Sequence, residues 1–162
     1  MRPRPLPCHS RAVAGFTLLE LVVVLVLLGV LATLVLPRVL EGSFRDAAFA
    51  EQVATAFRYA QRLAVATGCE IEVQVDAGTS SYAVRRRADG TDTLCGSSGP
   101  FTLDVPSPGG SGAFAGTATG GVRVTQGLTL RFDAEGRPTP AGGTVVVGGR
   151  SIVIEPETGH VR

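Results

Sequence analysis

The feature that most constrains this chain is an uninterrupted apolar block that begins at Phe16 and ends at Leu36, just before Pro37. A helix rises about 1.5 Å per residue, so a helical block of this length would be roughly 30 Å long, which matches the hydrocarbon core of a bilayer. Three arginines precede it: Arg2, Arg4 and Arg11. Because positive charge stays on the cytoplasmic side, we expect a membrane span over 16–37 and everything after Pro37 outside the cytoplasm.

One acidic residue, Glu20, lies inside the apolar block. A carboxylate in an apolar span is costly unless it is paired or lies near the interface. The block contains no Lys, Arg or His, but cleavage after Gly15 would create an ammonium group at Phe16. We hypothesise that Glu20 pairs with the Phe16 amine of its own or a neighbouring chain, which would fix the stagger between helices in a filament. The alternative is a glutamate near the headgroups of a plain single-span anchor.

The run GFTLLE at 15–20, with a short basic segment before it and the apolar block after it, resembles the type III signal of type IV prepilins and type II secretion pseudopilins. The resemblance implies that residues 1–15 are a cleaved leader peptide. It also implies that a prepilin peptidase cuts between Gly15 and Phe16 and methylates the new amine of Phe16. In this family the residue at the place of Glu20 serves filament assembly, and Pro37 stands where the long helix is often kinked.

Helical periodicity continues beyond Pro37. Apolar residues recur at spacings of three and four with charged residues between them, which is typical of an amphipathic helix. Thr67 and Gly68 supply a stop, because glycine commonly follows the end of a helix. We therefore expect one helix from about Phe16 to Thr67, bent at Pro37, with an amphipathic half over 38–68. Its predicted apolar face consists of Leu40, Phe44, Ala47, Ala48, Val53, Phe57, Ala60, Leu63 and Ala64.

The sequence predicts a β-rich head over residues 69–162. Short alternating or β-branched segments are separated by Gly, Pro and Asp. The predicted turns are Asp89-Gly90, Glu135-Gly136 and Gly148-Gly149. The glycine-rich stretch 106–121 predicts a mobile connection. The predicted strands are 70–75, 82–87, 101–105, 122–125, 128–132, 144–147 and 151–154. A mostly antiparallel sheet packed on the amphipathic half of the helix would bury both apolar faces, so the predicted fold class is α+β.

The carboxy-terminal half resembles the GspH/FimT group of minor pseudopilins and minor pilins. The resemblance is carried by LTLRFDAEGR at 128–137, GGTVVV at 142–147, the strand at 152–154 and TGHVR at 158–162. It implies a type IV pilin-like fold. DNA-uptake members of this group tend to end in Gly-Arg-x-Arg, whose arginines bind phosphate. Here His160 stands at the first of these arginines and only Arg162 matches. The candidate contacts to DNA or a partner are Arg137, Arg150 and Arg162.

Two cysteines remain once the leader, which carries Cys8, is removed. In an oxidising compartment a bridge between Cys69 and Cys95 would add roughly 3 kcal/mol of stability by restricting the unfolded chain. The alternative is a pair of partly buried thiols. Metal binding is not expected, because two cysteines and His160 have no ligand spacing.

Charge and composition argue against two further classes of function. Removal of the three leader arginines leaves 12 basic residues against 14 acidic ones, a net charge of −2, which does not suit a dedicated nucleic-acid binder. In the run Arg85-Arg86-Arg87, strand alternation places Arg86 on the opposite face from its neighbours, which favours a solvated edge strand. No histidine or carboxylate pair is arranged for acid–base catalysis and no phosphate-binding loop is present, so we predict a non-enzyme without cofactors.

Two functions remain. The first is a structural minor pseudopilin of a type II secretion pseudopilus, which takes part in protein export. The second is a minor pilin of a type IV pilus, including a DNA-binding one in natural transformation. In either case the expected partners are other pseudopilins or pilins through the amino-terminal helix, the prepilin peptidase and the inner-membrane assembly platform. The expected location is the bacterial inner membrane, with a single span and a periplasmic head that joins a periplasmic filament.

Overall fold

The computed structural model describes residues 16–88, 95, 99–110 and 112–162, with residues 33–41 described by their backbone alone. The chain forms two units, Met1–Arg38 and Val39–Arg162, and the helix α1 (Leu18–Thr67) contributes to both. We call the second of these the carboxy-terminal unit. The strands that follow the helix are β1 (Ile71–Asp76), β2 (Ser81–Arg87), β3 (Phe101–Asp104), β4 (Ala115–Thr117), β5 (Val124–Gln126), β6 (Leu128–Phe132), β7 (Pro138–Thr139), β8 (Gly143–Val147) and β9 (Arg150–Ile154).

The carboxy-terminal half of α1 buries one apolar face. Val53, Phe57, Ala60 and Ala64 are fully buried, and their spacing of three and four residues places them on one side of the helix. This part of the predicted face is confirmed. The helix ends at Thr67, as predicted, because the N–H of Gly68 closes the last turn on the carbonyl of Ala64 at 2.8 Å.

The beginning of the predicted apolar face is wrong. The Phe44 side chain is 69% exposed, and Ala48 is exposed as well, whereas Phe49 and Ala50 are buried instead. The physical reason lies in the loops that reach this level of the helix. They are glycine turns that approach Arg45 and Asp46 rather than Phe44. Leu40, the first residue of that predicted face, lies outside the residues whose side chains are described.

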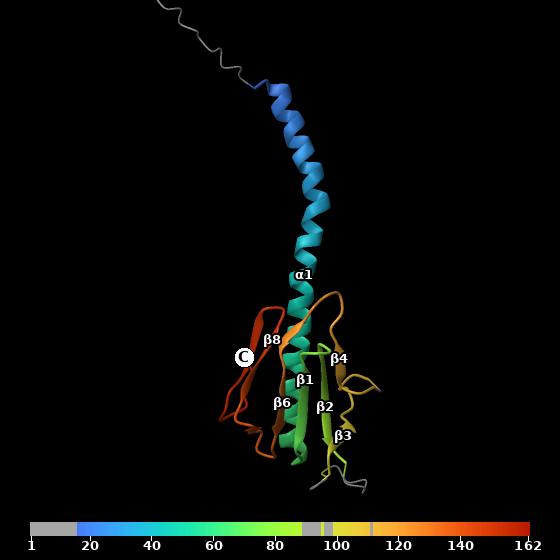
Figure 1. Cartoon of the computed structure of the whole chain (residues 1–162), viewed down its shortest axis with the longest axis vertical. Helices are drawn as coiled ribbons and strands as arrows, with labels where there is room; N and C mark the ends of the chain where they lie inside the picture. Colours follow the sequence, from blue (N-terminus) through green and yellow to red (C-terminus); the bar gives the residue numbers. More distant parts are fainter. Residues whose placement is uncertain (1–15, 89–94, 96–98, 111) are drawn as a thin grey trace, which may run out of the picture. The chain divides into compact units, whose positions relative to one another are not determined.

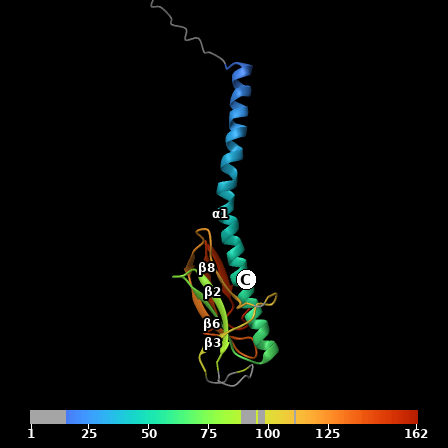
Figure 2. The same ribbon diagram turned by 90° about the vertical axis from the view of Figure 1, so that its right-hand side faces the viewer.

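The strands form two antiparallel sheets. The larger has the order β3-β2-β1-β6-β7, with β4 also paired to β2, and the smaller has the order β5-β8-β9. Figure 1 shows β1, β2 and β6 side by side in front of the carboxy-terminal half of α1, and Figure 2, turned by 90°, shows the strands as a layer beside that half. The predicted α+β fold with a mostly antiparallel sheet is therefore confirmed.

Alternation along the strands builds one core. Ile71, Val73 and Val75 of β1 are buried against the helix, whereas Glu72 and Gln74 between them lie on the outer face. Every residue of the buried cluster lies between Phe49 and Val161, and both sheets contribute to it. Burial of a side chain such as Phe57 stabilises the fold by about 1.5–3 kcal/mol. The buried cluster lies entirely within the carboxy-terminal unit, so we expect this unit to fold without the amino-terminal unit.

The prediction of a mobile connection over 106–121 is wrong for its second half. Within it, β4 pairs with β2, and Phe114 packs edge-on against Tyr59 and Tyr82 with ring centroids 5.0 and 6.1 Å apart. The ring of Tyr82 lies where a side chain on Gly116 would be, so this glycine is required by packing. Burial raises the pKa of the Tyr82 hydroxyl. The low apolar content of this segment predicted mobility, but packing of Phe114 holds the segment in place.

Most predicted strands occur within one or two residues of their expected bounds. The segment predicted at 122–125 is shifted to β5, and the short strands β4 and β7 were not predicted. The turn predicted at Asp89-Gly90 lies outside the described residues. The turn at Glu135-Gly136 is present, and it is closed by the N–H of Gly136 on the carbonyl of Asp133 at 2.9 Å.

The turn predicted at Gly148-Gly149 joins β8 to β9, because Val147 and Arg150 are paired across it. Both glycines have positive φ, +54° and +81°, which is the backbone of a type I′ hairpin turn. Gly148 also lies directly against the Asp46 side chain of α1, so an added Cβ would collide with that side chain. Gly149 has open space around it.

These two glycines give a matched test. We expect Gly148→Ala to lower the free energy of unfolding by about 2–4 kcal/mol, because left-handed strain and steric overlap add together. Gly149→Ala should cost about 1–2 kcal/mol, since it suffers the strain alone. Urea denaturation of the carboxy-terminal unit measures both. Equal losses would show that contact with α1 is unimportant at this turn.

Candidate functional site

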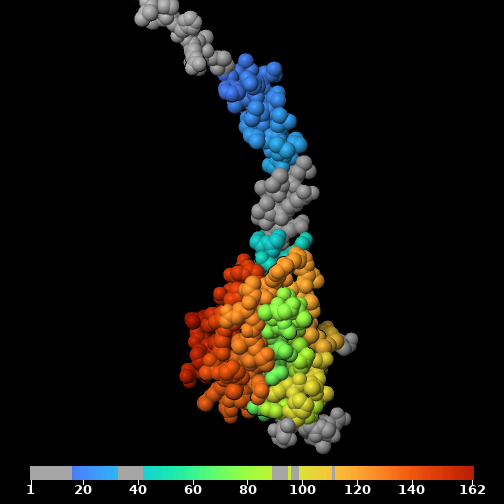
Figure 3. Space-filling view, viewed as in Figure 1, coloured from blue at the N-terminus to red at the C-terminus, as the bar shows by residue number. Residues whose placement is uncertain are grey.

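The amino-terminal unit exposes large apolar side chains along its whole described length. Phe16 is 83% exposed and Leu18 81%, and the apolar residues from Leu19 to Leu31 are all at least 44% exposed. Figure 3 shows these residues as the blue atoms. Exposed apolar patches of this extent mark contact with a membrane or with other proteins.

The first turn of α1 is capped by Thr17. Its hydroxyl accepts a hydrogen bond from the N–H of Glu20 at 3.2 Å, and its carbonyl accepts the first helical bond from Leu21 at 3.2 Å. The sequence Thr-x-x-Glu is the capping-box pattern, and an acidic side chain in the first turn interacts favourably with the helix dipole. The sequence analysis missed this role of Thr17, although the pattern was visible. Glu20 therefore lies in the first turn of the helix, and it is exposed.

No helix among the described residues is both long enough and apolar enough to count as a membrane span. The span predicted over 16–37 includes residues 33–37, whose side chains lie outside the described residues, and it stays a prediction. The backbone is helical at Pro37. The predicted kink there also stays a prediction. Gly15 lies outside the described residues.

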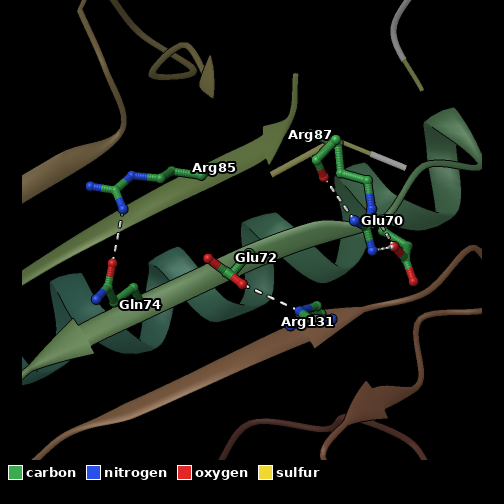
Figure 4. Close-up of polar contacts among 7 residues, drawn as sticks. Glu70, Glu72, Gln74, Arg85, Arg87 and Arg131 are labelled. Atoms are coloured by element: carbon green, nitrogen blue, oxygen red, sulfur yellow. Dashed lines mark hydrogen bonds and ion pairs between the residues drawn. The ribbon is translucent and has the colours of Figure 1, made fainter. Parts of the chain in front are cut away.

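On the outer face of the large sheet, acidic and amide groups lie on β1 or directly before it. Arginines of the two neighbouring strands, β2 and β6, flank them. Arg87 bonds Glu70 at 2.7 Å, Arg131 pairs with Glu72 at 3.3 Å, and Arg85 donates to Gln74 at 2.9 Å, as Figure 4 shows. The Phe101 ring lies within cation–π distance of both Arg87 and Arg131, at 4.4 and 5.1 Å. These arginines are engaged within the unit, whereas Arg86 lies on the opposite face of the strand, beside α1.

Of the three arginines predicted to contact DNA or a partner, two lie together. Arg150 and Arg162 line one cavity of about 160 Å³, which they share with Arg58 of α1. Arg162 pairs with Glu155 at 2.8 Å and Arg58 with Glu51 at 2.7 Å, so much of the positive charge is neutralised locally. Arg137 does not line this cavity; it is exposed beyond the turn after β6.

Gln61 is a positioning residue that the sequence analysis missed. Its side-chain amide donates to the carbonyl of Gly136 at 3.0 Å and to that of Thr158 at 2.6 Å. One helix side chain thus holds two loops that are distant in sequence, the turn after β6 and the turn before the chain end. A polar residue between Phe57 and Ala64 on the predicted apolar face was the signal that could have identified it.

Cys69 and Cys95 form a disulfide in the structure, with their Cα atoms 4.9 Å apart. Cys69 is buried directly after α1 and Cys95 is exposed. The bond therefore ties the end of the helix to the segment between β2 and β3. Cys69 cannot serve as a free thiol in this state.

Metal binding and acid–base chemistry would depend on the acidic, cysteine and histidine side chains of the described residues. No group of three His, Cys, Asp or Glu among them could hold a metal ion. The Asp133 carboxylate accepts hydrogen bonds from the N–H groups of Glu135 and Arg137, at 3.0 and 2.7 Å, which is turn chemistry. His160 is exposed near the end of the chain.

Comparison with known proteins yields two family matches. A model described as the prokaryotic N-terminal methylation motif matches residues 10–36. A model described as type II transport protein GspH matches residues 50–158, which is more than half of the chain. No curated protein and no solved structure matches.

The disulfide gives a stability prediction. We expect Cys95→Ser to lower the free energy of unfolding by about 2–4 kcal/mol, because a closed loop of this length restricts the unfolded chain. Cys95 is exposed, so the serine itself adds no buried polar group. Thermal unfolding of the carboxy-terminal unit, with and without a reductant, measures the effect. A reductant that destabilises the variant as strongly as the parent would contradict this origin of the loss.

Proposed function

The chain belongs to the family of the type II transport protein GspH, and on this premise we propose that it is a minor pseudopilin, a structural subunit of the pseudopilus that serves protein export. Members of this family are structural proteins, so the predicted non-enzyme is confirmed by family membership. The pilin-like α+β fold agrees with that assignment.

The observation that carries the proposal is the uncovered apolar half of α1 with a single acid in its first turn. Among the helix side chains that the structure describes, those in the buried core begin at Phe49. The side chains before it need either lipid or the helices of other subunits around them. We propose that lipid surrounds this half before assembly and that neighbouring pseudopilin helices surround it in the filament.

Processing creates the partner for the acid. The methylation motif that matches residues 10–36 supports cleavage between Gly15 and Phe16 by a prepilin peptidase, followed by methylation of the Phe16 amine. The new ammonium group and Glu20 then neutralise one another between adjacent subunits inside an apolar environment, where unpaired charges are costly. Pro37 would allow the helix to bend as subunits pack.

The same segment defines the location. Before assembly, residues 16–37 span the inner membrane once, with the leader in the cytoplasm and the carboxy-terminal unit in the periplasm. The inner-membrane assembly platform then extracts the subunit into the periplasmic filament. The disulfide supports the periplasmic placement, because such bonds form in oxidising compartments.

A second candidate is a DNA-binding minor pilin of a type IV pilus. It is favoured by one observation: Arg58, Arg150 and Arg162 gather at one cavity from three separate segments. Two of these guanidinium groups are paired with Glu51 and Glu155, which weakens the case for phosphate binding.

The assembly proposal can be tested at Glu20. In cells that carry the full assembly machinery, Glu20→Ala should still be inserted, cut before Phe16 and methylated, yet be absent from sheared filaments. The reason is that the charged Phe16 amine would have no Glu20 carboxylate to pair with at the contact between adjacent subunits. Glu51→Ala, which removes an exposed acid further along the same helix, is the control and should assemble normally. Mass spectrometry of the amino terminus and immunoblots of filament fractions measure both steps, and normal incorporation of Glu20→Ala would contradict the proposal.

DNA binding separates the secretion pseudopilin from the DNA-binding minor pilin. We expect the carboxy-terminal unit to show no salt-dependent binding to double-stranded DNA at low ionic strength, because two of the three arginines at the shared cavity, Arg58 and Arg162, are paired with glutamates. Binding that is weakened by Arg150→Gln and Arg162→Gln but not by Arg137→Gln would support the pilus function instead. Fluorescence anisotropy with a labelled duplex measures it.

A further inference from the structure

The carboxy-terminal unit has a cavity with a mostly apolar lining near the end of α1. This cavity of about 290 Å³ opens between the end of α1, the first residue of β1, Arg86 of β2 and residues 105–107, which follow β3. Ile71 and Val105 at its base are buried, and Tyr59 and Leu63 of α1 form a half-buried apolar wall. The remaining lining includes Arg86 of β2. The cavity is therefore an apolar hollow with one cation at its side.

Arg86 is placed there by the geometry of the strand. Its neighbours Arg85 and Arg87 bond Gln74 and Glu70 on the outer face, so alternation turns Arg86 to the face of the cavity. The register between β2 and β3 shifts between Arg86 and Arg87, and bulges of this kind re-aim side chains. Among the described residues that line the cavity, Arg86 alone is charged, and it makes no ion pair within the described part of the chain.

The surroundings extend the apolar surface. Leu103, which is paired with Arg86 across the two strands, is 40% exposed. The cavity itself lies at the lower end of the roughly 300–1,000 Å³ typical of small-molecule sites. A hollow of this size suits one large side chain, the kind of anchor that dominates protein interfaces. The unpaired guanidinium calls for a carboxylate beside that anchor.

We propose that this cavity is the docking site for a peptide segment of a partner protein that carries one large apolar side chain next to a carboxylate. The apolar side chain fills the space between Tyr59, Leu63 and Val105, and the carboxylate bonds Arg86. The described lining of this cavity belongs to the carboxy-terminal unit alone, and the proposal goes beyond the assembly role of the amino-terminal part of α1. Failure of the docking proposal would therefore leave the proposed function unaffected.

The test uses the carboxy-terminal unit, residues 39–162, because its core is complete. The probe is the acetylated and amidated peptide Gly-Asp-Phe-Asp-Gly, titrated at low salt and followed by amide chemical shifts. We expect saturable shifts at Leu63, Ile71 and Val105. The peptide Gly-Asp-Ala-Asp-Gly should bind at least about tenfold more weakly, since it lacks the apolar anchor.

Two matched arginine variants test the charge. Arg86→Gln should weaken binding of the Asp-Phe-Asp peptide about three- to fivefold, whereas Arg85→Gln, on the opposite face of the same strand, should leave it unchanged. The corresponding Asn-Phe-Asn peptide should bind the parent as weakly as the Asp-Phe-Asp peptide binds Arg86→Gln.

Four results would overturn the proposal. They are the absence of saturable shifts, equal binding of the Asp and Asn peptides, an equal effect of Arg85→Gln and Arg86→Gln, and shifts of the same amides with protein concentration alone. The last result would assign the cavity to a second copy of this chain, with the exposed Phe44 as the side chain to substitute next.

Discussion

One constraint governs the molecule: a single helix, α1, has an apolar surface along its whole described length, and its own chain covers only the later part. From Phe49 onward the two sheets bury that surface and form the core. Before Phe49 the large apolar side chains that the structure describes, from Phe16 to Leu31 and at Phe44, remain exposed. The later part of α1 therefore takes part in the core of the carboxy-terminal unit, whereas the earlier part is the segment proposed to contact lipid and other subunits.

Within the carboxy-terminal unit, a few specific contacts add to apolar burial in holding the helix, strands and loops together. The Gln61 amide fixes two loops at once, Gly148 lets a hairpin turn approach Asp46, and Gly116 makes room for the ring of Tyr82. On the far side of the sheet, charge pairs and the Phe101 ring replace a second covering layer. The outer face of the sheet can therefore remain exposed to solvent, whereas the inner face is buried against α1.

The fold class and most strands were predictable from sequence, because period-two and helical patterns report burial directly. Phe44 was misplaced because periodicity shows that a face is apolar but not how far along the helix a sheet covers it. The segment around Phe114 was missed because one aromatic residue among glycines gives no periodic signal. At the candidate site, Glu20 stood out as a charge in an apolar block, whereas the gathering of Arg58 with Arg150 and Arg162 depends on contacts between segments distant in sequence.

The bond between Cys69 and Cys95 has a consequence for when the unit matures. Thiols remain reduced in the bacterial cytosol and are oxidised in the periplasm. With the proposed periplasmic location, a chain still in the cytosol would keep Cys69 and Cys95 as thiols and would form this bond only after export. The oxidation state of the two cysteines would then distinguish newly made chains from exported ones.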